Sequence, residues 1–178
     1  MSIESPIQGI YAKLGVEFAG NTPVAGGNDT TAGSTNRYYT FFTLAGTSND
    51  LYICTALEPK NGSVVSGNLL CGLDVVDANP PTLANTTTVA CTAVTAQAGT
   101  SAVQKITVSH SDIIRGGTLL GAWVVSSSAA TGKIATTTVG AKNCQRAIAQ
   151  AAPALTHQTA WTSATEEAYV KAYFKKIF

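Results

Sequence analysis

The stretches RYYTFFTL (residues 37–44) and LYICTAL (residues 51–57) decide the class of fold. Both are rich in aromatic and β-branched residues, which favour strands because such side chains suit a pleated, half-buried surface. Glu58-Pro59-Lys60-Asn61-Gly62 follows, and Asn-Gly is a strong signal for a hairpin turn. Residues 69–76 continue the strand pattern until Asn79-Pro80-Pro81 breaks it. This region therefore predicts antiparallel strands joined by short turns.

The chain beyond this region is rich in Thr, Val and Ala and is punctuated by glycine. NTTTVACTAV at 85–94 and AVQKITVS at 102–109 alternate with a period of two, as half-buried strands do. LLGAWVV at 119–125 is continuously apolar, which is typical of a strand buried on both faces. We therefore expect a mainly β fold, a compact antiparallel β-sandwich or barrel, with its core domain at residues 37–160.

The first 36 residues predict an extended N-terminal segment. A short alternating run from Tyr11 to Phe18 favours a strand. The stretch GNTPVAGGNDTTAGSTN at residues 20–36 then shows no periodicity, and a long segment of this kind is uncommon inside a compact domain. Residues 1–36 are therefore interpreted either as an arm that reaches a neighbouring subunit or as an exposed loop.

The last segment, residues 161–178, predicts an amphipathic helix. Ser163 and Glu166 have the spacing of a capping box, and Lys175 and Lys176 would lie in the last turn, where cations suit the helix dipole. The apolar residues at helical spacing are Tyr169 or Val170, Tyr173, Phe174 and Ile177. Such a helix either packs on its own sheet or docks on a partner.

The composition favours a protein whose surface is covered by neighbours. Charged residues make up 12% of the chain, against about 25% in an ordinary soluble domain. Small Thr, Ser, Ala and Gly side chains lose little rotamer freedom when a partner covers them. The net charge is +1 and no basic run occurs, so no nucleic-acid partner is expected.

The sequence carries no sign of a membrane segment or an export signal. The opening MSIESPIQGIYAKLG has neither the basic region nor the apolar run of a secretory signal. No apolar stretch has the length needed to span a bilayer. We therefore expect no membrane partner and folding in a cytoplasm.

Few residues suggest catalysis. Ser109-His110-Ser111-Asp112 is the best local candidate, but neighbouring residues on a strand point to opposite faces and cannot form a relay by themselves. The second histidine is His157, far along the chain. None of the common nucleophile, zinc, phosphate-loop or dinucleotide motifs occurs. The sequence predicts a protein that is not an enzyme and takes no cofactor or small-molecule substrate.

Four cysteines stand at positions 54, 71, 91 and 144. They form no C-x-x-C pair and no histidine lies at ligand spacing, so no metal site is predicted. Two disulfides are conceivable, with Cys54 and Cys71 flanking a hairpin turn and Cys91 meeting Cys144, although four cysteines allow three pairings. In a cytoplasmic protein the alternative is buried free thiols.

Residues 112–155 contain three short motifs in series. Ile113 to Leu120 reads IIRGGTLL, Thr131 to Ile134 reads TGKI, and Gln145 to Ala152 reads QRAIAQAA. This order resembles a segment of tailed-bacteriophage head decoration (cement) proteins, in which a strand with a Gly-Gly pair, a Gly-Lys-Val hairpin and a Gly-Ile-Ala segment follow one another. Arg146 stands where the family usually has glycine, and the family has a strand where a C-terminal helix is predicted here.

The resemblance implies a virion structural protein that decorates and stabilises a capsid. Members of that family are small β-rich domains, often trimers, that bind the major capsid protein on the outside of the shell without catalysis. The alternatives are a phage tail or fibre component and a self-assembling extracellular filament subunit, pilus-like, whose strands complete a neighbour's sheet. The residues expected to make assembly contacts are Tyr11, Val16, Phe18, Tyr173, Phe174, Ile177 and Phe178.

Overall fold

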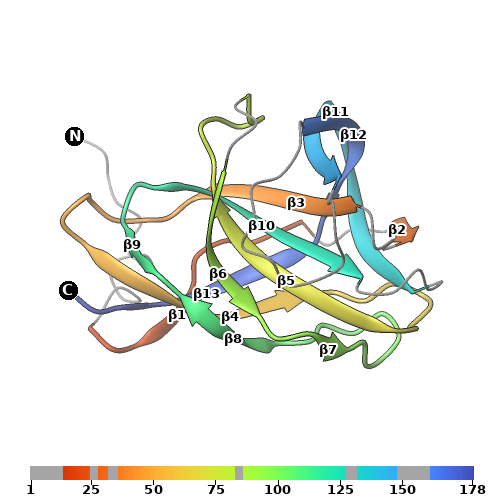
Figure 1. The fold of residues 1–178 in the computed structure, drawn as a ribbon, viewed down its shortest axis with the longest axis horizontal. Helices are drawn as coiled ribbons and strands as arrows, with labels where there is room; N and C mark the ends of the chain where they lie inside the picture. Colours follow the sequence, from red (N-terminus) through yellow and green to blue (C-terminus); the bar gives the residue numbers. More distant parts are fainter. Residues whose placement is uncertain (1–13, 25–27, 32–35, 83–85, 127–131, 148–160) are drawn as a thin grey trace.

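The computed structural model describes residues 14–24, 28–31, 36–82, 86–126, 132–147 and 161–178, and every regular element within them is a β-strand (Figure 1). No helix occurs in these ranges, and so none that could cross a membrane. The strands are β1 (Glu17–Ala19), β2 (Asn28–Thr31), β3 (Asn36–Thr43), β4 (Leu51–Pro59), β5 (Asn68–Val75), β6 (Thr87–Thr92), β7 (Thr95–Ala96), β8 (Ile106–Ser111), β9 (Ile113–Arg115), β10 (Leu119–Ser126), β11 (Lys133–Ala147), β12 (Trp161–Ala168) and β13 (Val170–Lys176).

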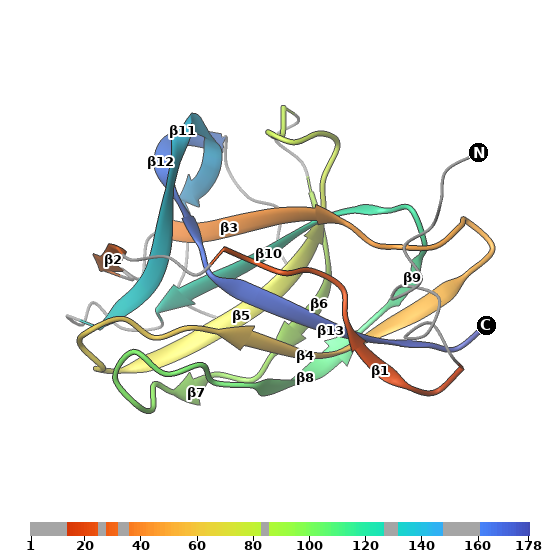
Figure 2. The ribbon, with the colours of Figure 1, turned by 180° about the vertical axis from the view of Figure 1, so that it is seen from behind.

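The strands form one antiparallel sheet in the order β1-β13-β4-β8-β6-β5-β10-β3-β11-β12. Three short strands pair beside this path, β2 with β11, β7 with β5 and β9 with β4. The sheet curls into a half-barrel, so that β5 and β10 lie nearer in Figure 1 and β13 and β1 nearer in the reverse view of Figure 2. The prediction of a mainly antiparallel β fold is confirmed.

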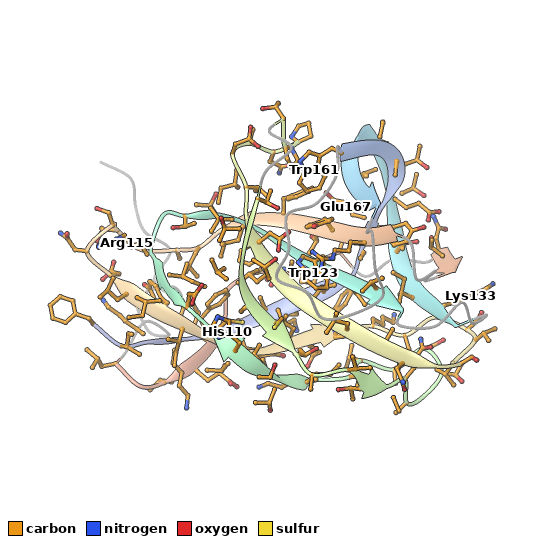
Figure 3. All side chains as sticks on the ribbon, viewed as in Figure 1. His110, Arg115, Trp123, Lys133, Trp161 and Glu167 are labelled. Carbon is orange, nitrogen blue, oxygen red and sulfur yellow. The ribbon has the colours of Figure 1, made fainter. Side chains whose placement is uncertain are left out.

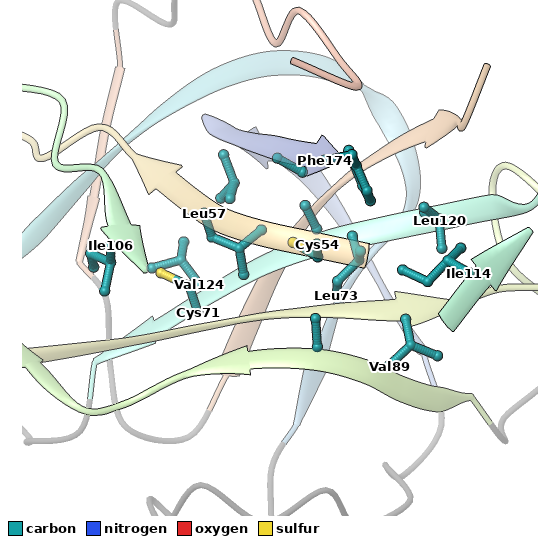
Figure 4. Close-up of a cluster of buried hydrophobic side chains, with 14 of the residues drawn as sticks. Cys54, Leu57, Cys71, Leu73, Val89, Ile106, Ile114, Leu120, Val124 and Phe174 are labelled. Carbon is teal, nitrogen blue, oxygen red and sulfur yellow. The ribbon is translucent and has the colours of Figure 1, made fainter. Parts of the chain in front are cut away.

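The curl encloses the main hydrophobic core. Alternate residues of β4, β5, β10 and β13 project into it, and Figure 4 shows them meeting in one interior. Phe174 of β13 lies edge-on to Phe42 of β3, with ring centroids 6.2 Å apart, although β3 and β13 are far apart in the sheet order. The largest side chains that are fully buried in this core include Tyr52, Leu57, Leu73, Leu120 and Phe174.

The opposite face of β3, β5 and β10 carries a second, smaller cluster. Tyr39, Leu70, Trp123 and Val125 are buried there, and Trp161 of β12 packs against them. The Trp161 ring meets Tyr39 edge-on at 4.8 Å between centroids. The central strands are therefore apolar on both faces, as the continuous run at residues 119–125 predicted.

The helix predicted over residues 161–178 is wrong, because this segment forms β12 and β13. Val170, Ala172 and Phe174 are buried, whereas Lys171 and Tyr173 between them are only half-buried. Val, Tyr and Phe favour strands, and their alternation satisfies the pleat of a sheet whose inner face is buried. The same apolar residues also fit a helical period, which is why their spacing in the sequence indicated a helix.

The Asn61-Gly62 dipeptide does not form the predicted hairpin turn. β4 ends at Pro59 and β5 begins at Asn68, so a longer connection joins them. Asn61 makes an isolated antiparallel bridge with Ile134 instead. The left-handed conformation in this connection belongs to Gly67, with φ 82°.

The described parts of residues 1–36 pair with the chain's own sheet. β1 runs antiparallel to β13, with Phe18 opposite Phe174, and β2 pairs with β11. The Asn21 side chain extends the pairing, because its Nδ2 donates to Val170 O at 2.9 Å and its Oδ1 accepts from Ala172 N at 2.7 Å. Residues 1–13, which include Tyr11, lie outside the described residues.

Candidate functional site

The most concentrated polar centre surrounds Asp74 of β5, which is fully buried. Its Oδ1 accepts hydrogen bonds from Trp123 Nε1 at 2.7 Å and Thr88 Oγ1 at 2.8 Å. Its Oδ2 accepts from Tyr39 hydroxyl at 2.8 Å and Thr86 Oγ1 at 3.2 Å. We call these five residues the Asp74 cluster. It ties together β3, β5, β6 and β10.

The Asp74 cluster is shielded by aromatic and cationic groups. Arg37, itself buried, lies with its guanidinium carbon 3.8 Å from the centroid of the Trp123 ring. Tyr39 is covered by Phe41, which stacks on it at 5.8 Å, and by Trp161. Four hydrogen bonds to a buried carboxylate satisfy its charge without leaving a coordination position open. This arrangement is suited to holding strands together.

The Ser109–Asp112 tetrad is not assembled as a relay. His110 Nε2 lies 3.1 Å from Asp112 Oδ1, and both side chains are about half exposed. Ser109 Oγ donates to Cys91 O, while Ser111 Oγ accepts from Cys54 N and donates to Asp112 O. Both serine hydroxyls are thus hydrogen-bonded to backbone atoms. Figure 3 shows His110 on β8, which β6 and β5 separate in the sheet order from Trp123 on β10. His157 lies outside the described residues.

A network of charges covers the outer face of β1, β4 and β13. Tyr173 donates its hydroxyl to Glu58 Oε2 at 3.0 Å, and Lys171 lies 3.7 Å from the other oxygen of Glu58. Lys105 sits 3.8 Å from the Tyr173 ring centroid and pairs with Glu17. Burial, followed by the contact with Glu58, raises the pKa of Tyr173 to about 12. The hydrogen bond from Lys105 lowers the pKa of Glu17.

A group of large apolar side chains is exposed at one end of the sheet. Phe178 and Leu14 are each 71% exposed, Ile113 62%, Val16 46% and Ile177 38%. We call these five residues the terminal rim. Figure 2 shows the C-terminal residues emerging beside β1, and β9 lies at the same end.

Backbone contacts hold the terminal rim together. Leu14 bridges to Lys176, and Ile177 N donates to Leu51 O. Leu51 N in turn donates to Phe178 O, and Leu51 stands opposite Arg115 of β9. The segment before β1 and the C-terminal residues are therefore adjacent, whereas β4 lies between the C-terminal segment and β9, which carries Ile113.

The structure separates the described contact residues that the sequence predicted into three groups. Val16, Ile177 and Phe178 belong to the terminal rim. Phe174 is fully buried in the main core, so it is not available for an assembly contact. Phe18 and Tyr173 are half-buried. Leu14 and Ile113 were not predicted, since only the bridge from Leu14 to Lys176 and the pairing of β9 with β4 place them at this end of the sheet.

Cys54, Cys71 and Cys91 are buried free thiols, so the Cys54–Cys71 disulfide is not formed. Burial raises the pKa of Cys54 to about 12 and also raises the pKa of Cys71. Cys144 is a residue of β11, and the structure does not describe its side chain. The second suggested pair, Cys91 with Cys144, therefore involves a side chain outside the described part of the structure and stays a prediction.

We expect Cys54 and Cys71 to resist alkylation in the native protein. At about pH 8.5, the ordinary pKa of a free thiol, neither group forms the reactive thiolate while it is buried. Iodoacetamide followed by peptide mass spectrometry should label both positions in urea and neither in native buffer. Rapid native labelling of Cys71 would contradict its burial, and the denatured sample serves as the control for reagent access.

Comparison with known proteins identifies no relative. No family model matches the chain, and neither the curated proteins nor the solved structures gave a significant match. Among the described residues, no three His, Cys, Asp or Glu side chains gather closely enough to hold a metal ion. The site must therefore be interpreted from its own geometry.

Proposed function

We propose that this protein is a structural component of a virion that decorates and stabilises a capsid, binding the major capsid protein and its own copies. The observation that carries the proposal is the terminal rim. Soluble domains seldom leave several large apolar side chains exposed together unless a partner covers them. The chain as a whole carries few charged residues, 12%, which lowers the cost in desolvation and side-chain entropy when neighbours cover it.

The segment that resembles decoration proteins supports the proposal. Residues 113–115 and 119–126 form β9 and β10, and residues 133–147 form β11, so the described parts of the three motifs lie on strands or at their ends. The C-terminal segment is also strand, which removes one of the two departures from that family. In a symmetric shell, modest contacts repeat on every copy and accumulate through multivalency.

A tail, fibre or filament subunit is the second candidate. β12 ends the hydrogen-bonded order of the sheet, where it pairs with β11. A strand at the end of a sheet presents backbone donors and acceptors that a neighbouring chain can pair with. If this candidate were correct, substitutions in β12 would impair assembly, whereas substitutions in the terminal rim would not.

The decoration proposal is tested by adding the purified protein to expanded, undecorated capsids. Binding should co-sediment the protein with the shells and raise their melting temperature. The double variant Ile177→Ser, Phe178→Ser should weaken binding at least about tenfold, because an interface loses most of its affinity with a few central apolar anchors.

The matched control is Val103→Ser, which removes an exposed apolar side chain (51%) from the connection between β7 and β8. Val103 forms a β-bridge with Lys60, which follows the last residue of β4. The control therefore lies at the opposite end of β4 from Leu51. The control should bind shells as the unaltered protein does. Equal binding by the rim variant and the control would rule out the rim as the contact, and no binding by any form would overturn the proposal.

A further inference from the structure

Asn61-Gly62 is the only Asn-Gly dipeptide in the sequence, and the proposed function leaves it unexplained. In such a pair the backbone nitrogen of the glycine can attack the side-chain carbonyl carbon of the asparagine. A nitrogen–carbon bond forms, the amide leaves as ammonia, and a succinimide ring results. Water then opens the ring to aspartate or isoaspartate. Glycine favours the reaction because it has no side chain to restrict the backbone.

The leaving amide of Asn61 is held in place by oxygen atoms. Asn61 is fully buried, and its Nδ2 donates to Ala98 O at 2.6 Å and Gly99 O at 3.1 Å. The side-chain oxygen of Gln104 lies 3.4 Å from the same nitrogen. Because all three neighbours are acceptors, the site suits an amide and provides no acid that could protonate it as it leaves.

The attacking nitrogen and the carbonyl are restrained too. Gly62 N donates to Lys133 O at 2.9 Å, and Asn61 N donates to Ala102 O at 2.8 Å, so the backbone on both sides of the reacting bond is fixed. Within the described part of the chain, Asn61 Oδ1 is buried and accepts no hydrogen bond. A negative charge that develops on this oxygen during attack would therefore lack stabilisation.

We propose that Asn61-Gly62 is a conformationally gated modification site, which is inert in the folded protein and deamidates only when the loop at residues 97–104 opens or the chain unfolds. The reaction also prevents refolding. The acidic product would place an anionic oxygen against Ala98 O and Gly99 O, where the amide had been a donor. A chain that stays unfolded long enough for Asn61 to deamidate can therefore no longer refold.

The test compares native protein with protein held in urea at the same mildly alkaline pH, and follows the mass of the peptide that contains Asn61. Deamidation should be at least about 100-fold slower in the native protein, which corresponds to an opening free energy of about 2.8 kcal/mol at 1.4 kcal/mol per factor of ten. Equal rates in both samples would overturn the gating.

A second measurement tests the block on refolding. The variant Asn61→Asp reproduces one product of the reaction, and Asn49→Asp makes the same change at an exposed turn residue. We expect Asn61→Asp to show a clearly lower urea midpoint or to fail to fold, while Asn49→Asp keeps the midpoint of the unaltered protein. Matching midpoints for the two variants would contradict the proposed clash with the carbonyl oxygens.

Discussion

Replacing Asp74 with alanine is expected to lower the free energy of unfolding by about 3–5 kcal/mol. The carboxylate is the common acceptor for Tyr39, Thr86, Thr88 and Trp123, and all four donors are buried. Without it, these buried donors lose the hydrogen bond to the carboxylate and cannot replace it with one to water. Urea denaturation followed by tryptophan fluorescence measures the change, because Trp123 reports on the same cluster.

Two further variants make the Asp74 prediction specific. Asp112→Ala removes a carboxylate whose side chain is 51% exposed, and should alter stability by less than about 0.5 kcal/mol. Thr86→Val removes one donor and leaves the acceptor in place, so it should cost about 1 kcal/mol. If Asp74→Ala and Asp112→Ala unfolded at the same urea concentration, the cluster would not be what holds β3, β5, β6 and β10 together.

Replacing Phe174 with alanine is expected to destabilise the protein by about 3–5 kcal/mol, the usual loss for a large aromatic side chain removed from a core. Phe174 is fully buried between two other rings, Phe18 at 6.1 Å and Phe42 at 6.2 Å. It also packs on Gly20, whose α-carbon faces the ring so closely that an added methyl would lie 2.4 Å from it. No neighbour can easily fill the space that the ring leaves.

Phe178→Ala is the control for Phe174→Ala, because it removes the same side chain from a position that is 71% exposed. Its effect on stability should stay within about 0.5 kcal/mol. Similar losses for the two variants would contradict the strand assignment, in which Phe174 points inward and Phe178 lies past the end of β13. If the loss of the Phe178 side chain leaves stability unchanged, weaker capsid binding by a Phe178 variant cannot be attributed to unfolding.

The central strands could be predicted from the sequence because both their residue types and their hydrophobic pattern favour strands. The aromatic and β-branched runs at residues 37–44, 51–57 and 119–125 became β3, β4 and β10. The prediction failed at residues 161–178, where the apolar positions fit both a period of two and a helical period. Local signals at Ser163 and Glu166 then favoured the helix, whereas pairing with β4, more than 100 residues earlier, favoured the strand.

The Asp74 cluster and the terminal rim could not be predicted in the same way. Asp74 stands alone in the apolar run LLCGLDVV, and nothing local shows that donors from three other strands surround it. Leu14, Ile113 and Phe178 likewise lie far apart in the chain. Their placement at one end of the sheet depends on strand order and register, which a single sequence specifies only through the complete set of long-range pairings.

The position of β13 has a consequence for how the protein is made. This strand lies between β1 and β4, so a segment translated more than 100 residues after β4 fills the gap between the two. A nascent chain that has not yet released residues up to Lys176 presents the edge of β4 unpaired and the main core without Phe174. Closure of the sheet must therefore follow translation of residues up to Lys176, and such non-local pairing makes folding slow. During that interval, chaperones that shield strand edges would matter most.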